Sequence, residues 1–269
     1  MNQPIENDKS FLRNDRKLVC SMLLFYGLCI LGLVGATFWG LDHRNKTVSA
    51  NATSTAAAVA TQQARTTSTA IARATEHAQY EFVDRFSNNE EEWMAEIVND
   101  EYMTGSVKII SGVYLWDAQK VKKPFVYWAS FHDMEKFKDF DVYVDSKITD
   151  EQPGDACSGL VFRAASTDWE MGAYVFSVCS NSTFSVYYYE KGDWESILRQ
   201  TYSDAIRNSD WNRLEISARG DDFTFGINNE VVFEMTDDRQ SRGGLAVYIE
   251  VNEKSPVSIS FDNFGLQPR

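Results

Sequence analysis

Apolar and polar residues alternate in short runs from Tyr80 to the end of the chain, with the period expected of half-buried β-strands. Turn-forming pairs containing Gly, Asn or Asp separate many of these runs. A helical period is nearly absent, apart from one turn expected near residues 88–97. The runs rich in Val, Ile, Tyr and Phe are residues 125–131, 140–148, 158–164, 172–178, 184–190, 212–220, 223–227, 230–235, 244–250 and 257–264. This pattern predicts an all-β fold, an antiparallel β-sandwich or jelly roll, over residues 80–269.

A different pattern occupies residues 18–41, which carry no charged side chain. About 20 apolar residues in a helix cross the hydrocarbon core of a bilayer, so this run predicts one transmembrane helix. Four basic residues lie within residues 1–17, which predicts a cytoplasmic N-terminal tail and an extracytoplasmic remainder. The expected location is the plasma membrane, with a single pass. A cleaved signal peptide is the alternative, with Val34 and Ala36 as the small residues of its cleavage site.

Residues 42–79 are rich in Ala and Thr and contain no Phe, Tyr or Trp. Such a segment cannot bury a core of its own, so we interpret it as a stalk. The sequence therefore predicts four parts: a tail (1–17), a transmembrane helix (18–41), a stalk (42–79) and an extracytoplasmic β-sandwich domain (80–269).

Charge is unevenly distributed between these parts. Residues 1–79 hold 8 basic and 5 acidic residues, whereas residues 80–269 hold 18 basic and 34 acidic residues. A domain this acidic repels nucleic acid, so no nucleic-acid partner is expected. The acidity either serves solubility or attracts a cationic ligand.

Cys157 and Cys179 are the two cysteines of the predicted sandwich. A hairpin that turns at Asp168 places them directly opposite each other, close enough for a disulfide. Oxidising conditions outside the cytoplasm would preserve that bond, and two free thiols are the alternative. In the same register Leu160, Phe162, Tyr174 and Phe176 face the core.

The other face of this hairpin carries the candidate ligand site. Continuing the register into residues 184–190 places Tyr187 and Tyr189 on the core face, and Tyr188 and Glu190 on the second face. Arg163, Ala173 and Glu190 then form one row, with a small residue between two charged ones, as in a shallow groove. Trp169 at the hairpin tip and Trp194 after the next turn would rim it, because sugars stack on aromatic rings. The candidate ligand-binding residues are thus Arg163, Tyr188, Glu190, Trp169 and Trp194. The alternatives are a surface ion pair and ordinary packing of the tryptophans.

Several blocks resemble a known superfamily. They are GLVFRA and YVFSV (159–164 and 174–178), NRLEISARGDDFTFGINNEVVFE (212–234), GGLAVYIE (243–250) and the closing FDNF (261–264). Together they look like the concanavalin-A-like jelly-roll superfamily, in the branches of laminin-G-like domains and keto-disaccharide hydrolase (DUF1080-type) domains. The resemblance covers residues 80–269 and implies the fold more than an activity.

The sequence offers no catalytic set that we can assign. A glucanase of this superfamily would carry an E-x-D-x-(x)-E strand, and Glu230-Val-Val-Phe-Glu234 lacks the central acid. The predicted domain holds a single histidine, His132, and no G-x-S-x-G elbow. We therefore expect neither a serine-type triad nor a multi-histidine zinc site.

Calcium is the one metal that the resemblance suggests, since laminin-G-like domains often bind it. Oxygen ligands are available at Asp221-Asp222, Asp237-Asp238 and Glu250 to Glu253, although acidic turns are common on soluble domains. No other cofactor is expected.

The favoured function is non-catalytic recognition of a carbohydrate or another cell-surface ligand by a membrane-anchored module. Two alternatives stay open: a glycoside-cleaving enzyme of the keto-disaccharide hydrolase type, and a structural or adhesive head of a membrane assembly.

Overall fold

The computed structural model describes residues 79–131, 135–150, 156–166, 172–252 and 256–269. The predicted tail, transmembrane helix and most of the stalk lie outside these residues, as do His132 and Trp169. No helix within the described part of the chain is long and apolar enough to cross a membrane.

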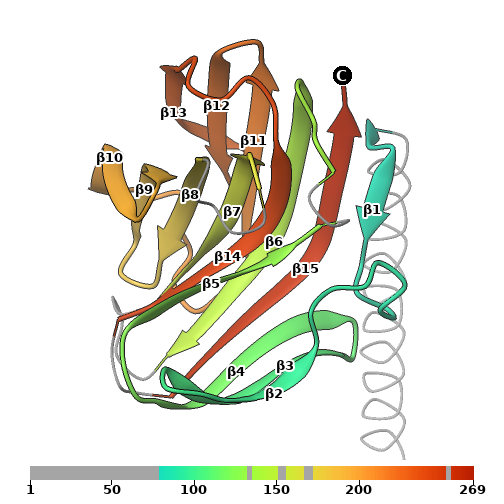
Figure 1. Cartoon of the computed structure of the whole chain (residues 1–269), viewed down its shortest axis with the longest axis vertical. Helices are drawn as coiled ribbons and strands as arrows, with labels where there is room; N and C mark the ends of the chain where they lie inside the picture. Colours follow the sequence, from blue (N-terminus) through green and yellow to red (C-terminus); the bar gives the residue numbers. More distant parts are fainter. Residues whose placement is uncertain (1–78, 132–134, 151–155, 167–171, 253–255) are drawn as a thin grey trace, which may run out of the picture. The chain divides into compact units, whose positions relative to one another are not determined.

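The described residues form two antiparallel sheets packed face to face, so the predicted all-β sandwich is confirmed (Figure 1). The larger sheet has nine strands, ordered β13-β12-β11-β6-β15-β4-β3-β2, with β1 paired to β15. Its strands are β1 (Phe82–Asp84), β2 (Glu96–Asn99), β3 (Met103–Ile110), β4 (Val113–Val121), β6 (Phe140–Asp150), β11 (Asn212–Arg219), β12 (Asp222–Ile227), β13 (Glu230–Thr236) and β15 (Val257–Pro268).

The smaller sheet has six strands, ordered β10-β9-β8-β7-β14-β5. They are β5 (Phe125–Ser130), β7 (Ala156–Ala164), β8 (Ala173–Cys179), β9 (Thr183–Glu190), β10 (Asp193–Tyr202) and β14 (Gly244–Val251). β10 and β5 are its edges, and chain-distant β14 lies between β7 and β5 (Figure 1).

All ten predicted strands are present, whereas β1 to β4 and β10 were not expected from the sequence. β10 is an edge strand whose side chains are mostly exposed, so it lacks the alternation that marks a half-buried strand. The helical turn expected near residues 88–97 is a single hydrogen-bonded turn, in which the Glu92 N–H donates to the Asn89 carbonyl, followed by β2.

The core lies between the two sheets and is rich in aromatic side chains. Alternate residues of the larger sheet point into it, as the buried–intermediate alternation along β11 illustrates. Leu160, Phe162, Tyr174 and Phe176 all belong to this core, which confirms their predicted direction. By contrast, every residue of β7 and β8 is buried, so both faces at the centre of the six-stranded sheet are covered. The face turned away from the core is where the candidate site lies.

Candidate functional site

Five aromatic side chains gather on the outer face of the six-stranded sheet, and we call this surface the aromatic face. It is made by Trp128, Tyr187, Tyr189, Trp194 and Tyr248. The ring of Trp194 lies 4.8 Å from Tyr189, 6.0 Å from Tyr187 and 6.5 Å from Tyr248, between centroids. Trp194 is 43% exposed, which leaves much of its surface open to solvent.

Small side chains lie beneath these rings on the central strands. They are Val161, Ala164, Ala173, Val175 and Ala246, all fully buried and all in one cluster with Tyr248. Because short side chains occupy the middle of the sheet, rings from β9 and β10 on one side can meet Tyr248 from β14 on the other. A ligand on this face would therefore contact the exposed ring of Trp194, whereas Tyr248 is only 2% exposed and supports that ring from beneath.

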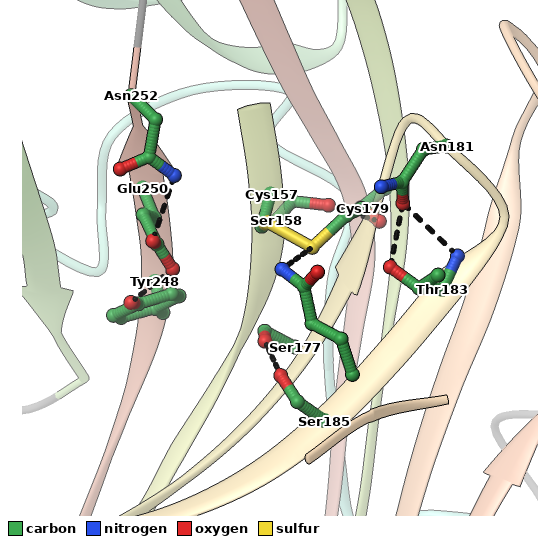
Figure 2. Close-up of a disulfide and its surroundings, with 12 residues drawn as sticks. Cys157, Ser158, Ser177, Cys179, Asn181, Thr183, Ser185, Tyr248, Glu250 and Asn252 are labelled. Carbon is green, nitrogen blue, oxygen red and sulfur yellow. Dashed lines mark hydrogen bonds between the residues drawn. A yellow bond between two sulfur atoms is a disulfide. The ribbon is translucent and has the colours of Figure 1, made fainter. Parts of the chain in front are cut away.

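A row of polar groups on β14 borders the aromatic face. The Tyr248 hydroxyl donates to Glu250 Oε2 at 3.0 Å, and the Asn252 amide donates to Glu250 Oε1 at 2.9 Å (Figure 2). Residues two apart on a strand share a face, so the three side chains stand in line. Burial and the nearby Glu250 carboxylate raise the pKa of Tyr248, which keeps its hydroxyl a donor at neutral pH.

The predicted disulfide is confirmed next to this row. Cys157 and Cys179 face each other on β7 and β8 and are bonded, with their Cα atoms 4.0 Å apart. Cys157 is also opposite Glu250 on β14. The hydroxyls of Ser177 and Ser185 lie 2.9 Å apart on the same face (Figure 2).

Arg163 does not lie on this face, and its predicted row with Ala173 and Glu190 is wrong. Its backbone φ is 50°, and the pairing of β7 with β14 shifts register at this point. Such a bulge reorients a side chain. The Arg163 guanidinium is fully buried, 4.6 Å from the centroid of the Phe223 ring.

Three backbone carbonyls accept hydrogen bonds from this guanidinium. Nη1 donates to Gln240 at 2.7 Å, and Nη2 donates to Lys138 at 2.8 Å and to Gly220 at 2.5 Å. Burial lowers the pKa of Arg163. The side chain thus joins three distant segments of the chain.

The prediction also assigned the side chains of β9 to the wrong faces of the sheet. Tyr174 pairs with Tyr188 across β8 and β9, so Tyr188 shares the core face with Tyr174. Tyr187 and Tyr189 point outward, opposite to the prediction. The predicted register was one residue out at the turn, and such a slip reverses every side chain of a strand.

The five predicted ligand-binding residues are therefore not brought together. Trp194 lies on the aromatic face, Tyr188 is in the core, and Glu190 at the end of β9 has its carboxylate 3.8 Å from the Lys191 ammonium. Trp169 lies outside the described residues.

Sequence reasoning missed Tyr248 as a neighbour of Trp194, and Glu250 as the hydrogen-bond partner of Tyr248. Their signal is the alternation Ala246, Tyr248, Glu250 in the run GLAVYIE, which puts a small, an aromatic and an acidic side chain on one face. The strand order that brings β14 beside β7 is not visible in the chain.

A charged cluster stands at another edge of the sandwich, around Asp237. Arg239 donates to both carboxylate oxygens of Asp237, and the Tyr174 hydroxyl donates to Oδ1 at 2.7 Å. The Arg239 guanidinium also lies 4.1 Å from the centroid of the Tyr188 ring. Burial raises the pKa of Asp237, but these hydrogen bonds outweigh it and lower the pKa from 3.8 to about 2.

Asp237→Asn is expected to lower the free energy of unfolding at neutral pH. A depressed pKa in the folded state contributes stability above the unfolded pKa, and this contribution is lost as pH falls from 3.8 through about 2. The difference in free energy of unfolding between Asp237→Asn and the parent should therefore vanish below pH 2. Urea titrations at a series of pH values measure this difference. Asp238→Asn, at the exposed neighbour, is the control. A gap that is independent of pH would contradict the assignment.

The three acidic stretches considered for calcium have other partners. Asp222 accepts from the Thr236 hydroxyl, Asp237 binds Arg239, and Glu250 accepts from Tyr248 and Asn252. Within the described residues, no group of three or more His, Cys, Asp or Glu side chains is arranged to hold a metal ion.

Comparisons with known proteins agree with this architecture. A model of the 3-keto-alpha-glucoside-1,2-lyase-like domain matches residues 84–266, which confirms the keto-disaccharide branch, one of the two that the sequence resembles. A search of curated proteins found no match.

Among solved structures, LamAcat from Zobellia galactanivorans has a TM-score of 0.51 at 10% identity, covering 69% of this chain and 96% of that one. SCLam, a non-specific endo-beta-1,3(4)-glucanase of family GH16, has a TM-score of 0.50 at 10% identity, covering 70% of this chain and 90% of that one. At these identities the likeness shows the jelly-roll fold alone.

Proposed function

Because the chain belongs to the 3-keto-alpha-glucoside-1,2-lyase-like domain family, we propose that its β-sandwich recognises a carbohydrate on the aromatic face. Family membership points to sugars as the ligand class. Carbohydrates present apolar ring faces and many hydroxyls, so they need aromatic surfaces together with a few oriented polar groups.

The observation that carries the proposal is the position of Trp194 beside the polar row of β14. Its ring contacts Tyr189 and Tyr248, and the Tyr248 hydroxyl is held by Glu250. The ring is thus braced by other aromatic side chains while much of it stays exposed. A braced ring loses little conformational entropy when a sugar stacks on it, which favours affinity.

Trp194→Ala is expected to weaken carbohydrate binding about tenfold, because it removes stacking area worth about 1.4 kcal/mol. The first step is a glycan array with the full-length chain. The affinity for each glycan that binds is then measured by calorimetry with both proteins.

Tyr202→Ala is the matched control for this experiment. Tyr202 is an exposed aromatic residue (64%) on the same strand β10 as Trp194, but it is not one of the five residues of the aromatic face. Its hydroxyl donates a hydrogen bond to Asp204. Binding should survive this change. An array without any hit, or equal affinities of the parent and Trp194→Ala, would contradict the proposal.

A glycoside-cleaving activity is the second candidate, and the lyase-like family favours it. Incubating the full-length chain with the 3-keto derivative of a disaccharide and analysing the mixture by mass spectrometry tests it. Release of monosaccharide products would establish cleavage, whereas binding without products would leave recognition as the function.

We also propose that the domain works outside the cytoplasm, anchored by residues 18–41. The Cys157–Cys179 bond supports an oxidising compartment, because disulfides rarely persist in the cytosol. Protease protection in intact cells tests this, since an extracytoplasmic sandwich is accessible to added protease.

A further inference from the structure

A hollow beside the edge strand β5 has no role in the proposed function so far. We call it the β5 hollow. Its volume is about 370 Å³, and it is lined by Tyr102, Pro124, Phe125, Val126, Tyr127 and Asn252. Five of these six residues are aromatic or aliphatic, and the sixth is an amide. A few polar groups on an apolar lining are typical of small-ligand sites.

The rings of the hollow are packed against one another. The Tyr127 ring lies 5.4 Å from Phe125 and 6.4 Å from Tyr102, between centroids. Tyr102 is 37% exposed, and the Lys123 ammonium lies 5.7 Å from the centre of its ring. Tyr102 therefore offers an accessible ring that already has a neighbour to hold its orientation.

Asp100 holds both sides of this hollow in place. Its Oδ1 accepts the backbone N–H of Tyr102 at 2.7 Å and that of Met103 at 2.8 Å, and its Oδ2 accepts the Tyr127 hydroxyl. The Tyr102 carbonyl in turn accepts the backbone N–H of Lys122 at 2.6 Å. These bonds preorganise the hollow, which lowers the entropy cost of filling it.

The hollow adjoins the polar row of the aromatic face. Val126 on β5 pairs with Glu250 on β14, and Asn252 both lines the hollow and donates to Glu250. Tyr248 and Asn252 are four residues apart, which is about 13 Å along a strand. One extended ligand can therefore pass from the exposed Trp194 ring beside Tyr248 over Glu250 to the hollow.

We propose that the β5 hollow is a second sugar subsite, which makes the ligand an oligosaccharide. One unit stacks on the aromatic face, the chain follows Glu250 and Asn252, and a terminal unit stacks on Tyr102. This inference rests on the proposed function. It adds that affinity grows with chain length until the hollow is filled.

The test uses the full-length chain and a series of laminari-oligosaccharides and malto-oligosaccharides, from disaccharide to hexasaccharide. The parent should bind the longest members about tenfold more tightly than the disaccharide. Tyr102→Ala should remove this gain and leave disaccharide binding unchanged. Tyr102→Phe keeps the ring and should behave as the parent. Thermal unfolding of each variant checks that the fold is intact.

The outcomes separate the two proposals. If the parent binds disaccharide and hexasaccharide equally, or if Tyr102→Ala weakens both equally, the subsite is overturned and recognition at the aromatic face stands. If the parent binds no member of either series and no glycan on the array, both proposals fall.

Discussion

Arg163→Met is expected to lower the free energy of unfolding by about 3–5 kcal/mol, the largest effect of a single substitution predicted for this protein. The guanidinium is fully buried, and its two terminal nitrogens donate to the carbonyls of Lys138, Gly220 and Gln240. Methionine fills similar space but leaves all three carbonyls without that donor. Each hydrogen bond from a charged donor contributes about 1.5–3 kcal/mol. Urea unfolding followed by tryptophan fluorescence measures the change.

Arg199→Met is the matched control, because Arg199 is an exposed arginine on β10. Its effect should stay within about 0.5 kcal/mol, as for most surface substitutions. Equal stabilities of Arg163→Met and Arg199→Met would show that the buried hydrogen bonds of Arg163 do not hold the sandwich together.

Loss of the Cys157–Cys179 bond is expected to destabilise the fold by about 3 kcal/mol. The cysteines are 22 residues apart, and opening a loop of this length restores that much conformational entropy to the unfolded chain. Both cysteines are buried on adjacent strands, so alanine at both positions should preserve the pairing of β7 with β8. The Cys157→Ala/Cys179→Ala double variant is compared with the oxidised parent in urea.

Adding a reductant separates the stability that comes from the disulfide bond from the stability that comes from packing of the two cysteine side chains. It should lower the unfolding midpoint of the parent to near that of the double variant and leave the double variant unchanged. If neither reductant nor the double substitution moves the midpoint, the disulfide does not contribute to stability.

The strand pattern and the cysteine pair were readable from the sequence for local reasons. Alternation depends only on whether successive side chains face a core or solvent, and a tight hairpin fixes which residues oppose each other. The position of Cys157 opposite Cys179 and the core direction of Phe162 and Tyr174 follow from these two rules, and both are confirmed.

The errors occurred where the alternation was interrupted. The turn after Cys179 does not fix its register from the sequence. An error of one residue there reversed the predicted faces of Tyr187, Tyr188 and Tyr189. The positive φ of Arg163 breaks the period inside β7 and turns a charged side chain into the core. Nothing in the run SGLVFRA marks that bulge, because carbonyls far along the chain are what make the buried guanidinium stable.

The sequence by itself determined the all-β class, ten of the strands and the position of Cys157 opposite Cys179, since each is set by local periodicity or by near neighbours in the chain. The tertiary structure alone decided which side chains meet on the aromatic face. Trp194 and Tyr248 lie 54 residues apart in the chain, on β10 and β14. They meet because β14 inserts between β7 and β5. Such strand order results from closing a core over the whole domain, and no local window of the sequence contains it.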